Sequence, residues 1–323
     1  MKERKKLLLL RPRKLGDTIL ATLVADALKR ARPSWEIHYL VEFPYAELFQ
    51  DHPSVDRVVK MPRGMGPWRT WEFATWLRKE DFDLALDLYS GLRTAFISRW
   101  CCPRSYGLRT RWAFLYTSSV PRRISPTSHH IENQFQLLNL LGIEEKPGPY
   151  RFPPPRPFPL EGPYAALHPF ASPLKSMSEI QARELASHLL DMGLLPVFLG
   201  DKGEAEAIER LGIGLNMAGL DLPSTRNLIA GARVFVGIDS GLAHLASTTR
   251  TPMVVVFGPH LPENYRPWRN FGVRIVERPL PCRPCFEKKC PWPYPRCVQD
   301  IPAEQILGEV EALLNNPSSY PPD

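Results

Sequence analysis

Short apolar runs alternate with segments of helical periodicity along the whole chain of 323 residues. In the first half, apolar runs predict strands at 7–10, 36–41, 55–59 and 82–88, and apolar spacing predicts helices at 19–28, 68–79 and 130–141. In the second half, the same patterns predict strands at 164–168, 195–199, 233–238 and 253–257, with helices at 178–192, 203–211, 223–231 and 302–314. Such alternation is typical of parallel α/β sheets.

The segment 147–163 separates these two halves. It is rich in proline, with Pro153, Pro154 and Pro155 in succession, and proline disfavours both helices and central strands. We therefore expect a stiff linker between a domain at 1–150 and a domain at 151–323, each doubly wound and Rossmann-like. The carboxyl ends of strands from both halves would then line an interdomain cleft that binds a ligand.

The charge and the N-terminus narrow the class of protein. A net charge of +7 indicates either an acidic partner, such as nucleic acid, an anionic membrane or a phosphorylated substrate, or simply an ordinary basic surface. No nucleic-acid-binding module is recognisable, so a basic nucleic-acid-binding protein is the weaker, non-enzymatic alternative and we expect no nucleic acid partner. The first apolar run stops at Leu10, before a basic stretch, and is too short for a signal peptide or a membrane span. We expect a cytoplasmic protein.

Four of the six cysteines are clustered near the end of the chain, with the spacing C-x2-C-x4-C-x6-C. In a cytoplasmic protein such a cluster suggests a structural metal more than disulfides, because cytoplasmic thiols stay reduced. Loop thiols without metal are the alternative. The candidate ligands are Cys282, Cys285, Cys290 and Cys297.

A phosphate pocket is indicated at 236–246, where an apolar strand runs into a Ser-Gly turn and then a small-residue helix. The beginning of a helix offers free backbone N–H groups and a positive dipole end, which suit a diphosphate. Asp239 could hold hydroxyl groups and Ser240 could touch phosphate, or either residue could simply cap the helix. His244, one turn further on, either contacts the ligand or packs inside.

Three other loops that follow predicted strands carry polar residues. Asp17 lies where the first strand meets the first helix, and it is either a general base or a helix cap. The single glycine there disfavours a dinucleotide fold. Ser172 and Lys175 are placed to bind a diphosphate, unless Lys175 is only a solvated loop residue. Glu204, or less readily Glu206, could hold ribose hydroxyls or simply favour a first helical turn.

Taken together and in order, these motifs resemble the heptosyltransferase family, glycosyltransferase family nine. The matching stretches cover nearly the whole chain: Leu15-Gly16-Asp17, residues 52–58, residues 87–93, His129-His130-Ile131-Glu132, residues 172–175, Met217-Ala218-Gly219, residues 239–246, Phe257-Gly258-Pro259 and the cysteine cluster. Two departures stand out. Pro169-Phe170-Ala171 replaces a glycine often found before the phosphate-binding serine, and Tyr89 replaces a usual glutamine, which bears on the acceptor.

The resemblance implies a GT-B fold and an inverting transfer of heptose from ADP-heptose to a lipopolysaccharide core, with no cofactor required for catalysis. It implies that the N-terminal domain binds the acceptor and the C-terminal domain the nucleotide sugar. Asp17 would then be the catalytic base, Lys175 would bind phosphate, Asp239 would hold the sugar, and Glu204 would lie near the ribose. Ser240 and Gly241 would contact the diphosphate. An enzyme using another sugar nucleotide or acceptor, or an NDP-sugar epimerase of the same fold, is the enzymatic alternative.

An anionic acceptor at the inner membrane surface would need basic residues, and we expect these in the first half of the chain. The candidates for acceptor binding are Arg63, Arg69, Arg93, Arg109, Arg111 and His129. Trp68, Trp71 and Trp76 lie near lipid or pack against the core, and their spacing on a predicted helix favours packing. The protein would then be peripheral at the inner face of the cytoplasmic membrane.

Overall fold

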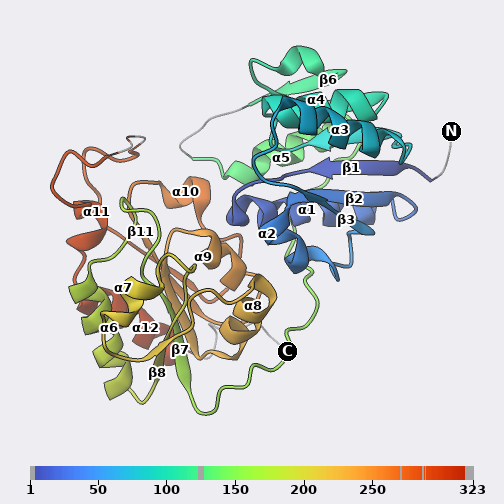
Figure 1. Ribbon diagram of the computed structural model, residues 1–323. Coiled ribbons are helices and arrows are strands. Elements are labelled where there is room, and N and C mark those ends of the chain that lie inside the picture. Colours follow the sequence, from blue (N-terminus) through green and yellow to red (C-terminus); the bar gives the residue numbers. More distant parts are fainter. Residues whose placement is uncertain (1–3, 123–126, 270, 286, 288, 317–323) are drawn as a thin grey trace. The chain divides into compact units, whose positions relative to one another are not determined.

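The computed structural model describes residues 4–122, 127–269, 271–285, 287 and 289–316 (Figure 1). The chain divides into two compact units, Met1–Pro153 and Pro154–Asp323. The division falls within the proline-rich segment, and residues 147–163 contain neither helix nor strand.

The N-terminal unit is built around one six-stranded parallel sheet. Its strands are β1 (Lys6–Leu10), β2 (Glu36–Glu42), β3 (Arg57–Met61), β4 (Leu84–Asp87), β5 (Arg104–Arg109) and β6 (Ser118–Pro121). Its helices are α1 (Leu15–Ala31), α2 (Phe43–Ala46), α3 (Pro67–Arg78), α4 (Leu92–Cys101) and α5 (His130–Asn139), with single 3-10 turns at Glu47–Phe49 and Ala113–Leu115.

The C-terminal unit repeats this plan with a second six-stranded parallel sheet. Its strands are β7 (Tyr164–His168), β8 (Leu195–Phe198), β9 (Leu215–Asn216), β10 (Val234–Ile238), β11 (Met253–Phe257) and β12 (Val273–Glu277). Its helices are α6 (Glu179–Asp191), α7 (Ala205–Glu209), α8 (Leu222–Gly231), α9 (Gly241–Ala246), α10 (Pro262–Tyr265), α11 (Arg296–Gln299) and α12 (Ala303–Leu314).

Both sheets have the strand order of a doubly wound fold. The first runs β3-β2-β1-β4-β5-β6 and the second β12-β11-β10-β7-β8-β9, with parallel pairing throughout. In each sheet the winding direction reverses between the first and fourth strands, β1 and β4 or β7 and β10. Ligands of such sheets bind beyond the carboxyl ends of the strands at this switch point. The predicted α/β fold with two doubly wound units is confirmed.

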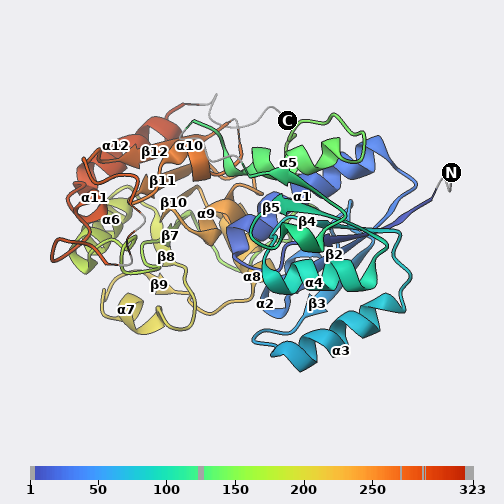
Figure 2. The same ribbon diagram turned by 90° about the horizontal axis from the view of Figure 1, so that it is seen from above.

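The central strands are apolar because helices cover both faces of each sheet. Leu7, Leu8, Leu9 and Leu10 of β1 are all fully buried, as expected for a strand with no solvent-facing side. In the N-terminal unit, α3 packs against α4 on one face of the sheet and α1 against α5 on the other (Figure 2). In the C-terminal unit, α6 packs against α12 on one face, and α8 and α9 cover the other (Figure 1).

Several elements were not predicted, and most of them lie toward the edges of the sheets. β5 has the sequence RSYGLR and β6 the sequence SSVP, so neither is an apolar run. β9 has only two residues. α4 has no clear apolar stripe in its sequence LRTAFISRWC, because small residues form most of its buried side.

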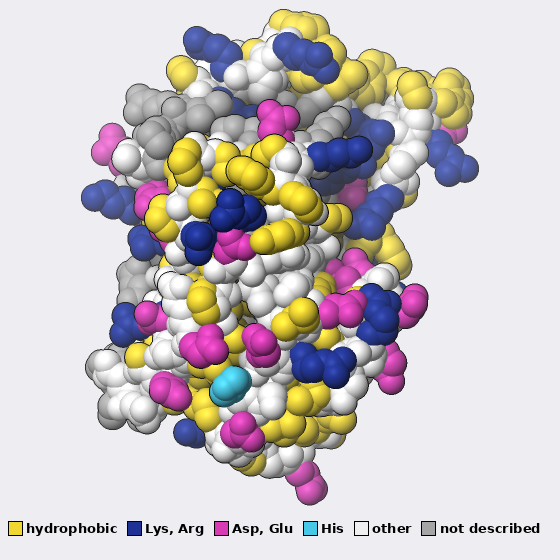
Figure 3. All heavy atoms as spheres, turned by 90° about the vertical axis from the view of Figure 1, so that its left-hand side faces the viewer, with side chains coloured by type: hydrophobic (Ala, Val, Ile, Leu, Met, Phe, Trp, Pro, Cys, Tyr) yellow, Lys and Arg dark blue, Asp and Glu magenta, His cyan; other side chains and the backbone are white. Residues whose placement is uncertain are grey.

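Two surface properties bear on function. Within the part of the chain that is described, no helix combines the length and apolar character needed to cross a membrane. On the face of the molecule shown in Figure 3, Lys and Arg side chains are interspersed with Asp and Glu, so no patch of a single charge sign dominates that face.

Candidate functional site

Two polar residues meet at the switch point of the C-terminal sheet. His168 is the last residue of β7, and Ser240 is the N-cap residue of α9, just beyond β10. The Ser240 hydroxyl lies 3.0 Å from His168 Nδ1 and accepts a hydrogen bond from the Ala243 N–H at 3.4 Å. Ser240 therefore does cap the helix, and its hydroxyl also lies at the place where a doubly wound sheet binds its ligand.

Asp239 is the charged centre of this switch point. Its carboxylate is buried and lies 2.5 Å from Lys175 Nζ and 2.9 Å from His260 Nδ1. Lys175 Nζ also donates to the Asp239 carbonyl at 3.1 Å. Burial by itself raises the pKa of Asp239, but the hydrogen bond from His260 and the charge of Lys175 outweigh it and lower the pKa to about 2. Asp239 is therefore a fixed anion at neutral pH.

The loop after β7 brings Lys175 to this carboxylate. The Ser172 carbonyl accepts hydrogen bonds from the N–H groups of Lys175 and Ser176, so the loop folds into a tight turn. Ser172 itself is exposed, whereas the Lys175 side chain is largely covered and reaches the end of β10. Lys175 is thus no solvated loop residue, and the structure joins it directly to Asp239.

The loop after β8 contributes Glu204 to the same region. The Glu204 carboxylate accepts the N–H of Asp201 at 2.9 Å, and one of its oxygens lies 3.8 Å from His168 Nε2. Glu204 is also the N-cap residue of α7. Glu206 has a side chain that is 90% exposed and lies 3.4 Å from Arg210, so it points away from this network.

Gly241 and His244 both belong to α9. Gly241 is the first residue of the helix, directly after the capping serine. His244 is buried, and its carbonyl accepts the Ser247 hydroxyl at 2.6 Å. The C-terminal candidates therefore converge at the ends of β7, β8 and β10, except for the exposed Ser172.

The switch point of the N-terminal sheet holds a second cluster. Asp17 is the third residue of α1 and binds Arg11 Nη2 at 2.5 Å. The N-cap residue of α1 is Lys14, so the interpretation of Asp17 as the helix cap is wrong. His130, the first residue of α5, places Nε2 3.9 Å from the Asp17 carboxylate. Burial, assisted by nearby arginine and lysine charges, lowers the pKa of His130 to about 4, so its imidazole is neutral at pH 7.

Arg11 connects this cluster to the end of β4. Its guanidinium donates to the Leu88 carbonyl at 3.0 Å and lies 5.4 Å from the centre of the Tyr89 ring. Asp87 is fully buried and holds the turn by accepting the N–H groups of Tyr89 and Ser90, each at 2.9 Å, and the Tyr116 hydroxyl at 2.7 Å. Burial raises the pKa of Asp87 despite these hydrogen bonds. Tyr89, where the sequence departs from the family pattern, therefore contacts Arg11, and Arg11 in turn pairs with Asp17.

The proposed acceptor residues have different local partners. Arg63 lies 3.1 Å from the buried Glu42, which also binds Arg13 at 2.6 Å. Arg93 donates to the Met65 carbonyl at 2.6 Å. Arg69, Arg109 and Arg111 have exposed side chains, and Arg111 lies over the Trp112 ring.

His129, also predicted to bind the acceptor, lies at the start of α5. It is buried and is the N-cap residue of α5, with Nδ1 accepting the Ile131 N–H at 3.2 Å. The His129 N–H in turn donates a hydrogen bond to the Glu132 carboxylate at 3.4 Å, which completes a capping box. His129 therefore has a structural role at the start of α5, its acceptor role stays a prediction, and its neighbour His130 is the histidine that faces Asp17.

The expectation that the tryptophans of α3 pack against the core is also wrong. Trp68, Trp71 and Trp76 are 66%, 38% and 45% exposed. The core side of α3 is instead formed by small and medium residues, Thr70, Ala74 and Leu77, which pack against α4.

The cysteine cluster is not assembled as a metal site. Within the described residues, no group of three or more His, Cys, Asp or Glu side chains could hold a metal ion. Cys282 is exposed and Cys297 is buried, and Cys290 Sγ lies 3.4 Å from the Tyr294 carbonyl. The prediction of a structural metal on the four cysteines is therefore not supported by their arrangement.

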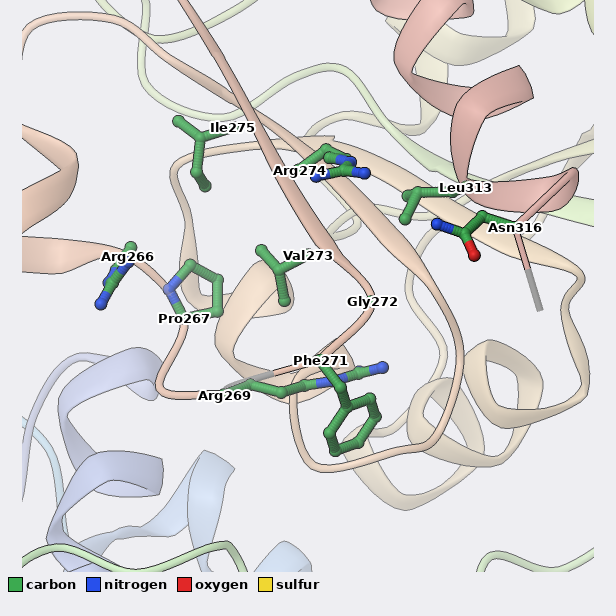
Figure 4. A pocket seen from close by; sticks show the side chains of 10 residues that line it. All are labelled: Arg266, Pro267, Arg269, Phe271, Gly272, Val273, Arg274, Ile275, Leu313 and Asn316. Carbon is green, nitrogen blue, oxygen red and sulfur yellow. The ribbon is translucent and has the colours of Figure 1, made fainter. Parts of the chain in front are cut away.

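A pocket of about 480 Å³ lies elsewhere in the C-terminal unit (Figure 4). It is lined by residues of the loop between α10 and β12 and of β12 itself, together with Leu313 and Asn316. Arg269 lies over the Phe271 ring at 4.0 Å and donates to the Thr249 carbonyl at 3.1 Å, and burial lowers its pKa to about 9. The lining includes none of the predicted donor residues, and Arg269 ties together two loops of the unit.

Histidines and one arginine were missed by reasoning from the sequence. His168 is the last residue of β7, Arg11 directly follows β1, and His260 lies in the loop after β11. A polar residue at the carboxyl end of a buried strand or in the loop after it was the available signal, as it was for Asp239.

Comparisons with known proteins agree with this arrangement. Residues 70–294 match the model of "Glycosyltransferase family 9 (heptosyltransferase)". The chain is 27% identical to lipopolysaccharide heptosyltransferase 1 of Pseudomonas aeruginosa, over 97% of this chain and 99% of that protein.

Solved structures of the same fold match nearly the whole length of the chain. A family 9 glycosyl transferase from Veillonella parvula is 16% identical with a TM-score of 0.84, over 96% of this chain and 97% of that one. The ADP-heptose LPS heptosyltransferase II of E. coli is 22% identical with a TM-score of 0.78, over 96% and 98%. These likenesses establish the GT-B fold. Because the family model covers well over half of its length, the chain belongs to glycosyltransferase family 9, and it is a glycosyltransferase.

Proposed function

We propose that this glycosyltransferase transfers a heptose from ADP-heptose to an anionic lipopolysaccharide core acceptor, with inversion at the anomeric carbon and without a catalytic metal. The names of its relatives support the donor and the acceptor. The observation that carries the proposal is the convergence of Lys175, Asp239 and His260 next to the capped start of α9. This arrangement provides cationic and N–H groups for a diphosphate beside an anion for sugar hydroxyls.

The C-terminal unit would bind the donor. Lys175, the Ser240 hydroxyl and the first N–H groups of α9 would stabilise the negative charge that grows on the departing ADP. Asp239, a fixed anion with a pKa of about 2, would accept hydrogen bonds from the sugar hydroxyls and orient the anomeric carbon. Glu204 would contact the ribose from the loop after β8.

The N-terminal unit would bind the acceptor and provide the base. Asp17 would take the proton from the acceptor hydroxyl as its oxygen attacks the anomeric carbon. Arg11 forms an ion pair with Asp17 and so fixes the position of its carboxylate. A neutral His130 adds no second positive charge beside this carboxylate. The exposed Arg69, Arg109 and Arg111 are the remaining candidates for binding acceptor anions, at the inner face of the cytoplasmic membrane.

The deciding experiment is a transfer assay with ADP-heptose and a panel of truncated lipopolysaccharide cores. Asp17→Asn should lower turnover by about 10²–10⁴-fold, the range of general-base contributions, while ADP-heptose affinity stays close to that of the wild type. Asp51→Asn makes the same chemical change at an exposed position and should leave turnover unchanged. Wild-type turnover in Asp17→Asn would refute the base, and transfer from another sugar nucleotide in preference to ADP-heptose would refute the donor.

A further inference from the structure

The outer surface of α3 and α4 carries an unusual set of exposed aromatic side chains. Trp68, Trp71 and Trp76 lie on α3, and Trp100, which is 36% exposed, lies on α4. The two helices pack against each other, and both views show them on the same face of the N-terminal sheet (Figures 1 and 2). Tryptophan is costly to leave in water, so such a group on one face indicates an interaction surface.

The aromatic side chains form one ring pair on each helix, and a hydrogen bond joins the two helices. The Trp68 and Trp71 rings are 4.9 Å apart, and Trp100 stacks on Phe96 at 5.7 Å. Trp100 Nε1 donates to the Thr75 hydroxyl of α3 at 3.2 Å, which joins the two helices across this surface. These contacts hold the indoles in place without burying them, as an amphipathic anchor requires.

The charges around these indoles are mainly basic. Arg78 lies 5.7 Å from the centre of the Trp100 ring, and Lys79 and Arg99 are also exposed. The sequence of α4 contains no acidic residue, and that of α3 contains only Glu72. Indoles flanked by lysine and arginine match the membrane interface, where tryptophan lies at the level of the headgroups and basic side chains attract anionic lipids.

We propose that the surface formed by Trp68, Trp71, Trp76, Trp100, Arg78 and Arg99 docks the enzyme on an anionic phospholipid bilayer. The inference rests on the proposed function in one respect, because an acceptor anchored in a membrane gives such docking its purpose. It assigns the contact to one surface of the N-terminal unit, α3 and α4, rather than to the positive charge of the protein as a whole.

The test is co-sedimentation of the full-length enzyme with vesicles of phosphatidylethanolamine and phosphatidylglycerol, compared with vesicles of phosphatidylcholine alone. The wild type should bind the anionic vesicles, with a blue shift of tryptophan emission, and bind neutral vesicles weakly. The double variant Trp68→Ser/Trp71→Ser should lose at least roughly tenfold in partitioning, since both anchoring rings are gone. Arg78→Gln/Arg99→Gln should lose roughly fivefold per charge and lose its dependence on salt.

The matched control is Trp292→Ser, which removes an indole that is 50% exposed in the C-terminal unit and should bind vesicles as the wild type does. Equal loss in this control, unchanged binding in the double tryptophan variant, or equal binding to neutral vesicles would overturn the proposal. It would also be overturned if the tryptophan variants changed only self-association in sedimentation, because the surface would then contact a second copy.

Transfer to a deacylated, water-soluble core acceptor separates this proposal from the proposed function. The tryptophan variants should keep wild-type turnover on that acceptor and lose it only on acceptor embedded in vesicles. If the wild type transfers heptose but fails to bind vesicles, the docking surface is refuted and the function stands. If it binds vesicles through these tryptophans but transfers no heptose, the docking surface stands and the function is refuted.

Discussion

Replacing Lys175 by methionine should destabilise the C-terminal unit, because it leaves the buried Asp239 carboxylate without its closest cation. The lowering of the Asp239 pKa from 3.8 to about 2 corresponds to about 2.5 kcal/mol. Since burial alone acts in the opposite direction, the combined contribution of His260 and Lys175 exceeds that figure. Breaking a buried ion pair on one side costs about 3–5 kcal/mol, and His260 remains, so we expect about 3 kcal/mol for Lys175→Met.

The signature of this mechanism is recovery by a second substitution. Asp239→Asn removes the charge that Lys175→Met leaves unpaired, so the double variant should be more stable than the sum of the single effects by about 2–3 kcal/mol. The double variant should still fail to transfer heptose, because both groups proposed to bind the donor are missing. This outcome would separate the stability of the site from its proposed chemistry.

The measurement is amide hydrogen exchange of the full-length protein, with peptides from β10 reporting on the C-terminal unit and peptides from β1 serving as an internal control. The pH dependence provides a further check. Asp239 has a lowered folded pKa, so its ionisation stabilises the unit above pH 3.8, and this stabilisation is lost as the pH falls toward 2. In Lys175→Met the folded pKa of Asp239 should rise, so the loss of stability between pH 3.8 and 2 should be smaller than in the wild type. An effect below about 0.5 kcal/mol, or additive single effects, would refute the reasoning.

Three further outcomes are expected. Tyr116→Phe should destabilise the N-terminal unit by about 1–3 kcal/mol in urea unfolding, because a buried carboxylate loses a 2.7 Å hydrogen bond; an unchanged midpoint would contradict this. Stability should fall by about 3 kcal/mol between pH 6.5 and 4, since the unfolded chain protonates His130 while the folded one resists; His130→Asn should flatten this profile, and an identical profile would count against it. Iodoacetamide should modify the exposed Cys282 well before the buried Cys101, as peptide mass spectrometry can show, and the reverse order would be inconsistent with the structure.

Much of the fold could be predicted, because central parallel strands are apolar on both faces. The leucines of β1 and the valines of β11 have no solvent-facing side, and their sequence shows it. Edge strands face solvent on one side and pair on one edge only, so β6 can tolerate serines and a terminal proline. The sequence of an edge strand therefore contains little of the signal by which a strand is identified.

The candidate site was predictable where a polar residue follows a buried strand, as Asp239 does, and less so where the partner comes from another loop. His260 reaches Asp239 only because β10 and β11 are neighbours in the sheet. The prediction that the tryptophans of α3 are buried failed for a different reason. Apolar periodicity favoured burial of the largest rings, but α4 approaches so closely that small residues such as Ala74 fill the contact instead.

The order of the twelve strands along the chain has a consequence for synthesis. All six strands of the first sheet lie before Arg122, and all six of the second lie after Pro163, so neither sheet needs a strand from the other half. The first sheet can therefore pair completely while the ribosome is still translating the second half, and no early strand has to wait unpaired for a distant partner. A nascent chain released in stages should show this as native-like protease resistance of the first half before β7 has been made.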